Sequence, residues 1–519
     1  MDKSQPTITS ESEKRKRVIK NIIAQLIYNA SVIGFGLVLP RLYLVSFGSD
    51  VNGLVSTVKD IFAYLALLEA GVGVASQYAL YRPVAKGEKQ NINEILSATR
   101  YFYRRTGIIY AGITLALAVI YPLVMKTNLD FLTVFIIIML YGLPGIVTFL
   151  TKGKYRPFLE VEGKSYIFGY INTATIVLGN ALRLFCLLFT DDLLLIQATY
   201  CVPTFFQVIV MYIYVKRKYP WINWKEKPNI QALSQKGSVL VHQISQVIFQ
   251  NTDSVILSVI CGMRYASVYA IYMLFFSNFD SLVQIFVGSI NFRLGQMFHT
   301  DKERFFKSYE LYETSLYMFA FMFYTVMAAF ILPIIQLYTK GVTDVEYLNP
   351  LFVILFTAVN LLVTFKHPNL QVINFAGKFQ ATRHQAVIEM IINISVSIVA
   401  TIYLGLIGCL IGTIAALSYR VNSTIIFSRK KIFGYGLFRE YKKLIVNGAL
   451  CAAILIFTGT SSCEAISYIH VIFHAALNGL WIAALFIAVN FAIEWKTLRV
   501  LPKIGKQTAL KFIKKANKK

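Results

Sequence analysis

Long apolar stretches follow one another along the chain and are separated by short polar segments. Most are about 20 residues long, the length at which an α-helix crosses about 30 Å of hydrocarbon. They are continuous rather than alternating, unlike the strands of a membrane barrel. Because backbone groups inside a bilayer must be satisfied within each segment, the pattern predicts membrane-spanning helices.

The pattern predicts an all-α fold, a polytopic membrane protein with about 14 transmembrane helices. Composition agrees, because 15% of the 519 residues are charged and a soluble chain has about a quarter. The expected spans are 20–46, 52–80, 103–123, 131–151, 166–189, 193–215, 238–261, 265–290, 309–338, 350–366, 384–404, 405–428, 444–461 and 467–493.

The distribution of Lys and Arg predicts the orientation, since these residues accumulate in cytoplasmic loops. With the N-terminus inside, about 44 of the 51 basic residues fall on cytoplasmic segments and three fall on outer loops, Lys126, Arg264 and Lys340. We therefore expect both termini in the cytoplasm. The same bias accounts for the net charge of +25 without a nucleic-acid partner.

A recurring offset of about 214 residues indicates a parallel internal repeat. It relates Gly48 to Gly262 and Gly163 to Gly377, and two six-helix halves are a recurrent plan of transporters. The expected organisation is an N-terminal tail (1–19), an N-lobe (20–215), an inter-lobe loop (216–237), a C-lobe (238–428), a two-helix hairpin (444–493) and a basic cytoplasmic tail (494–519).

Several stretches resemble the Wzx-type flippases, the polysaccharide-transport branch of the MOP (MATE-like) superfamily. The stretches are VNGLVSTVKDIFAYLALLEAGVGVASQYALY, NTDSVILSVICGMRYASVYAIY, LEVEGKSYIFGYIN and NFAGKFQATRHQAV. The resemblance covers nearly the whole chain, including the arrangement of six, six and two spans. Lipid II flippases and MATE drug exporters share the superfamily fold, so the fold alone does not choose among them.

The resemblance implies a function in the bacterial inner membrane. The substrate would be an undecaprenyl-pyrophosphate-linked oligosaccharide, turned from the cytoplasmic to the outer leaflet by alternating access. Membrane lipids and the lipid-linked substrate are the expected partners, together with the polysaccharide polymerase and glycosyltransferases of the same pathway. No cofactor is expected, although a proton or sodium gradient is a candidate for driving transport.

Ionisable residues within the spans are the candidate functional residues, because a charge deep in a bilayer is costly. Glu69 is either an ion site beside a glycine hinge or a carboxyl bonded between helices. Lys59 and Asp60 either line a polar cavity or extend to the surface. For Arg41, near the outer end of its span, we favour extension to the membrane surface. Arg183 is equally compatible with phosphate recognition and with an ion pair inside the bundle.

The second half contributes a polar helix face. Gln246, Gln250 and Asp253 recur at spacings of four and three, so they share one side of a helix. That side either lines a water-filled cavity or forms a hydrogen-bonded seam between helices. Asp280 lies near the middle of the next span, and Glu389 and Arg420 are close enough to the cytoplasmic face to extend to water.

These residues divide into two expected roles. The substrate-binding set is Arg41, Lys59, Arg183, Gln246 and Gln250, and the ion-coupling set is Glu69, Asp60, Asp253 and Asp280. No metal site is expected, because the six cysteines are scattered and the histidines lack ligand spacing.

The alternatives are a MATE-like drug antiporter, a lipid II-type flippase and, with less support, a polytopic glycosyltransferase or ligase. The last would need a sizeable outer loop, and the loops here are short. We expect a transporter and not an enzyme.

Overall fold

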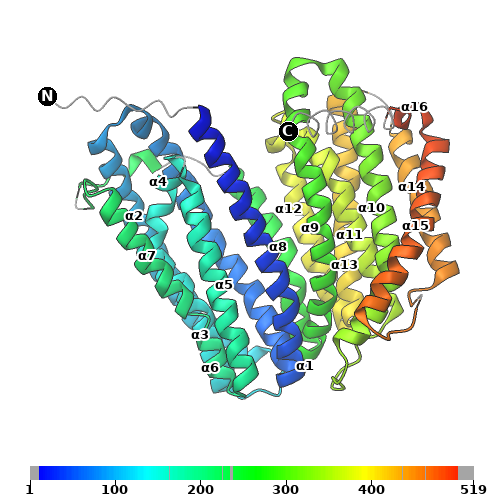
Figure 1. The fold of residues 1–519 in the computed structure, drawn as a ribbon, viewed down its shortest axis with the longest axis horizontal. Coiled ribbons are helices and arrows are strands. Elements are labelled where there is room, and N and C mark those ends of the chain that lie inside the picture. Colours follow the sequence, from blue (N-terminus) through cyan, green and yellow to red (C-terminus); the bar gives the residue numbers. More distant parts are fainter. Residues whose placement is uncertain are drawn as a thin grey trace, which may run out of the picture. The chain divides into compact units, whose positions relative to one another are not determined.

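Figure 1 shows the computed structural model of the chain, in which helices account for nearly every element. The structure describes residues 11–162, 164–224, 226–233, 238–434, 437–461 and 463–500. Within them, contacts divide the chain into two compact units, the first ending at Ser267 and the second beginning at Val268.

Among the described residues the first unit contains eight α-helices that end within it, some of them short, and the start of a ninth. In order they are α1 (Glu11–Lys86), α2 (Lys89–Val124), α3 (Phe131–Val147), the π-turn η1 (Thr148–Lys152), the 3-10 turn η2 (Gly153–Tyr155), α4 (Arg156–Val161), α5 (Ser165–Phe189), α6 (Leu193–Ala198), α7 (Val202–Lys218), η3 (Gln231–Leu233), α8 (Ser238–Ile260) and the first turn of α9 (Met263–Thr300).

The second unit is also helical throughout its described residues. After the rest of α9 it contains α10 (Lys302–Tyr338), α11 (Pro350–Phe375), the 3-10 turn η4 (Phe379–Thr382), α12 (Arg383–Leu404), α13 (Leu406–Ser428), the π-turn η5 (Arg429–Phe433), α14 (Phe438–Thr458), α15 (Tyr468–Ile493) and α16 (Trp495–Leu498).

The predicted all-α polytopic fold class is confirmed. Eleven helical segments of the described chain are long and apolar enough to cross a membrane. One of them, in α1, carries the first two predicted spans, which meet at the non-helical Gly48 (φ 77°, ψ −175°). Helices α8 and α9 carry the two predicted spans outside those eleven segments. Gly48 and its repeat counterpart Gly262 both have positive φ, which glycine adopts readily.

Helix α8 and the first turn of α9 pack against the second half of α1 in the antiparallel sense. Asn52 Nδ2 donates to Ser267 Oγ over 2.7 Å, and further along Asp60 pairs with Ser254. The contact is close: a Cβ on Gly53 would lie 2.0 Å from the carbonyl oxygen of Met263. The contacts therefore group α8 with the first unit, while the lobe boundaries expected at 215 and 238 stay a prediction.

Helices α12 and α13 form the tightest helix pair of the second unit. They are joined at Gly405, and Asn393 Nδ2 donates to Thr413 Oγ1 across the pair over 3.1 Å. A Cβ on Gly408 would lie 2.0 Å from the carbonyl oxygen of Ala400. Small residues that let two backbones approach are typical of helix packing in membranes.

We expect Gly408→Ala to lower the thermal unfolding midpoint, because the added methyl group meets backbone atoms that cannot rotate away. The matched control is Gly479→Ala, whose Cβ would lie 3.8 Å from the nearest side-chain atom, an ordinary contact. It should leave the midpoint unchanged or raise it, since alanine favours a helix by about 0.5–1 kcal/mol. Equal midpoints for both variants in one detergent would contradict the close packing.

Candidate functional site

A line of polar contacts joins α1 to α8 inside the first unit, and we call it the α1/α8 seam. Ser254 Oγ donates to Asp60 Oδ2 over 2.6 Å. One helical turn along α1, the hydroxyls of Tyr64 and Thr252 share a hydrogen bond of 2.8 Å. These are the partners that polar groups need within a membrane bundle.

Two charged residues lie beside this seam. Lys59 and Asp253 both interact electrostatically with Asp60. Asp253 is 2% exposed, whereas the Lys59 side chain is exposed within the apolar segment Ala30–Leu65, beyond the bend at Gly48. Because an ammonium group facing hydrocarbon is costly, the exposed side of α1 at Lys59 is best explained as facing water.

The amides expected on α8 are placed only in part. Gln250 is exposed one turn before Ser254. The side chains of Gln246 on α8 and Glu69 on α1 lie outside the described residues. The structure thus brings together Lys59, Asp60 and Asp253 of the predicted set, with Gln250 on the same helix as Asp253.

Arg183 of α5 lies on an aromatic surface. Its guanidinium carbon is 4.8 Å from the centre of the Tyr200 ring, and Nη1 donates to Asn180 Oδ1 over 3.3 Å. The Tyr200 ring packs against Tyr141 at 4.7 Å. None of the ion pairs among the described residues involves Arg183, so its charge is stabilised by the rings and is available to an anion.

The remaining predicted residues do not join the seam. Arg41 is partly exposed on α1 before the bend at Gly48. Asp280 belongs to the second unit, where it interacts electrostatically with Tyr324.

A surface pocket of about 360 Å³ lies between the loops that follow α2 and α8 and Asp50, just after the bend in α1 at Gly48. In it Asp50 Oδ2 accepts hydrogen bonds from Asn128 Nδ2 (3.0 Å) and Arg264 Nε (3.2 Å). None of the predicted site residues lines this pocket.

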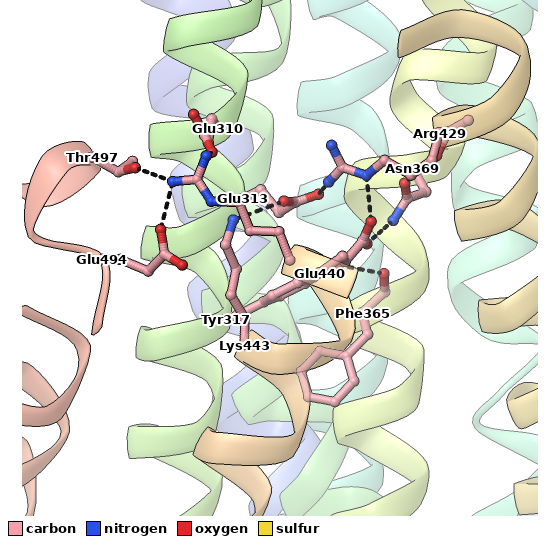
Figure 2. A network of polar contacts seen from close by, with 12 residues as sticks. Glu310, Glu313, Tyr317, Phe365, Asn369, Arg429, Glu440, Lys443, Glu494 and Thr497 are labelled. Carbon is pink, nitrogen blue, oxygen red and sulfur yellow. Dashed lines mark hydrogen bonds and ion pairs between the residues drawn. The ribbon is translucent and has the colours of Figure 1, made fainter. Parts of the chain in front are cut away.

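Four charges that the sequence did not single out are buried together in the second unit (Figure 2). Glu313 lies between two cations, with Oε1 at 2.5 Å from Arg429 Nη2 and Oε2 at 3.1 Å from Lys443 Nζ. Arg429 Nε also lies 2.6 Å from Glu440 Oε2. This buried charge quartet has no net charge, as a low-dielectric interior requires.

Neutral groups complete the hydrogen bonding of the quartet. Asn369 Nδ2 and the Tyr317 hydroxyl both donate to Glu440 Oε1, over 2.7 and 3.0 Å. Asn369 in turn accepts a hydrogen bond from Ser428. The network therefore ties α10, α11, α14 and the end of α13 together at one level.

A second buried ion cluster corrects the interpretation of Glu389 and Arg420. Their side chains do not extend to the surface: they are 9% and 3% exposed, and Arg420 Nε lies 3.3 Å from Glu389 Oε2. Lys366 Nζ lies 3.1 Å from the other oxygen. Mutual neutralisation, rather than access to water, stabilises these charges.

The count of Lys and Arg on predicted cytoplasmic segments did not reveal either buried network. It assigned Arg429, Lys443 and Lys366 to cytoplasmic segments, and the span expected at 444 in fact belongs to a helix that begins at Phe438. The available signal was acidic. Glu313 falls inside the expected span 309–338, and Glu440 is the one carboxylate in the basic segment 429–443; both positions require a partner for the carboxylate.

The comparisons with solved structures identify the fold. The chain is similar to the lipid II flippase MurJ in an inward closed conformation, with a TM-score of 0.64 at 13% identity, over 91% of this chain and 99% of that one. It is also similar to an inward-facing multidrug resistance MATE family transporter of the MOP superfamily, with a TM-score of 0.52 at 14% identity, over 82% and 99%.

A mutant of the Vibrio cholerae MATE transporter VcmN gives the same TM-score at 16% identity, again over 82% of this chain and 99% of that one. The chain has the fold of these membrane transporters. No protein-family model and no curated protein matches the sequence. The resemblance to the polysaccharide branch therefore stays a prediction.

We expect Glu313→Gln to destabilise the second unit, since it leaves Arg429 and Lys443 buried without their shared carboxylate. Loss of one partner from a buried ion pair costs about 3–5 kcal/mol. The control is Glu303→Gln on the same helix, which removes an exposed pair with Lys307 (83% and 77% exposed) and should change the midpoint little, because solvent screens exposed ion pairs. Thermal unfolding in lipid nanodiscs compares the two, and equal losses would show that the quartet is not buried as described.

Proposed function

We propose that this chain is a flippase for an undecaprenyl-pyrophosphate-linked oligosaccharide, which it moves from the cytoplasmic to the outer leaflet by alternating access. The observation that carries the proposal is the likeness to the lipid II flippase MurJ over 91% of the chain. The matches to MATE transporters cover 82%. The sequence resemblance to Wzx-type flippases points to a substrate of the same kind, a lipid with a pyrophosphate-linked sugar headgroup.

The electrostatic demand of such a substrate is met by cations of the first unit. A pyrophosphate cannot cross hydrocarbon unless its charge is compensated. Lys59 is exposed on α1, and Arg183 lies on the Tyr200 ring with its hydrogen-bonding capacity partly unused. We assign both to the headgroup, with Arg41 and the amides Gln246 and Gln250 as further contacts, while the polyprenyl chain stays in the lipid.

In this scheme, acidic residues bind the coupling ion that returns the transporter to its starting conformation. Asp60 and Asp253 interact electrostatically, and both lie at the α1/α8 seam. Two neighbouring carboxylates titrate as a pair and favour a shared proton or a cation between them. We therefore assign them to ion coupling, together with Glu69 and Asp280, with a proton or sodium gradient as the driving force.

The proposal also sets the cellular context. The protein would lie in the bacterial inner membrane with both termini in the cytoplasm, where Lys and Arg concentrate. The glycosyltransferases that build the oligosaccharide and the polymerase that extends it would be its pathway partners.

A MATE-like drug antiporter is the second candidate function. The two MATE transporters align over 99% of their own lengths, so the whole of that architecture is contained in this chain. The exposed Lys59 and the Arg183 guanidinium favour an anionic headgroup over a cationic drug, which is why we place this alternative second.

We expect the full-length protein in proteoliposomes to flip a fluorescent undecaprenyl-pyrophosphate disaccharide. Lys59→Gln, Arg183→Ala and Asp253→Asn should each slow the rate by roughly tenfold or more, because each removes a charge-assisted contact or an ion-coupling carboxylate. Lys340→Gln, an exposed cation on an outer loop, is the control and should keep the rate.

Normal rates in all three variants would remove these residues from the site. Failure to move the lipid, together with efflux of a cationic dye, would replace the flippase by the antiporter.

A further inference from the structure

Lys154 occupies an unusual environment at one end of the first unit. It follows α3 through the π-turn η1 and the 3-10 turn η2, an irregular passage of the kind that is frequent at functional sites. Its Nζ lies 4.6 Å from the centre of the Trp224 ring and 5.1 Å from that of Tyr155. The two rings meet edge-on at 5.3 Å.

The Trp224 ring is fixed by the segment that carries it. Asn223 N donates to Asn93 Oδ1 of α2 over 3.1 Å, and Ser97 Oγ donates to the carbonyl oxygen of Glu226 over 2.7 Å. Both anchors hold the segment on α2, one on each side of Trp224. The aromatic wall beside Lys154 is therefore part of the fold.

Two basic residues near Lys154 in the chain have carboxylate partners, whereas Lys154 has none among the described residues. Arg156 pairs with Glu160 at 2.9 Å, and Lys164 pairs with Glu162 at 2.7 Å. Among the described residues neither Lys154 nor Arg100 forms an ion pair, yet the two cations interact with each other. Burial and the Arg100 charge lower the pKa of Lys154 to about 8.

An anion between Lys154 and Arg100 would offset both the cost of burying the Lys154 charge and the repulsion between the two cations. Arg100 is exposed on α2, and Arg104 follows one turn later on the same face. Planar guanidinium and compact ammonium groups together are well suited to phosphate oxygens. The half-buried Lys154 would provide the fixed contact and the exposed arginines the outer ones.

The position of the site indicates which phosphate it meets. Lys154 stands three residues beyond the membrane-spanning segment Phe131–Thr151, and Trp and Tyr are the residues that gather at headgroup level. Basic pockets at helix ends bind anionic headgroups. We propose that Lys154 and Arg100, against the Trp224 ring, bind the phosphate of an anionic phospholipid headgroup. The site is separate from the α1/α8 seam and does not depend on the proposed transport activity.

Native mass spectrometry of the full-length protein with phosphatidylglycerol or phosphatidylcholine tests the proposal. The wild type should retain phosphatidylglycerol preferentially, and Lys154→Gln and Arg100→Gln should each weaken retention about tenfold, the effect of one charge-assisted hydrogen bond. Lys154→Arg should keep it. The control is Lys89→Gln, which removes an exposed cation 5.9 Å from the Trp221 ring and should change nothing.

Each other outcome overturns the proposal. Retention in both Gln variants would show that the phosphate binds elsewhere, and equal loss in Lys89→Gln would show a diffuse surface charge instead of a site. Displacement of the lipid by millimolar inorganic phosphate would identify a free-phosphate site rather than a lipid site. Should Lys154→Gln fold poorly, Arg100→Gln, at an exposed position, decides alone.

Discussion

The absence of water from the bilayer core governs how this chain handles its charges, because each one must be paired or must face a hydrated space. The second unit uses pairing. Its buried charge quartet balances two carboxylates with two cations, and Glu389 is shared in the same way by Lys366 and Arg420. The first unit leaves Lys59 exposed at membrane depth. The two units therefore differ in what their charges can do.

Pairing gives the second unit a mechanical role. The quartet and its neutral partners connect α10, α11, the end of α13 and α14 (Figure 2). Arg439 of α14 pairs with both Glu310 of α10 and Glu494 after α15. Reciprocal hydrogen bonds between Asn447 and Asn490 join the last two long helices. Such a fully satisfied network rigidifies the helices that it links.

The sequence predicts the membrane helices well, since hydrophobic length alone decides them, and Gly48 was expected to close the first span. The candidate site is predicted only in part. Lys59, Asp60 and Asp253 were each singled out, but their proximity across α1 and α8 was not predicted. The quartet was missed because its residues are far apart in the chain, from Glu313 to Lys443, and no local period connects them. A charge tally cannot distinguish a loop lysine from one buried in the first turns of α14.

A side of α1 that faces water at Lys59 must be accessible to polar reagents inside the membrane. Single cysteines at Lys59 and at the buried Leu54, in a background without the six native cysteines, would be treated with a charged, membrane-impermeant thiol reagent. We expect rapid labelling at 59, labelling at Gln250→Cys on α8, and none at 54, which is fully buried. Absence of labelling at 59 and 250 in active protein would contradict a hydrated wall and remove the basis for headgroup passage there.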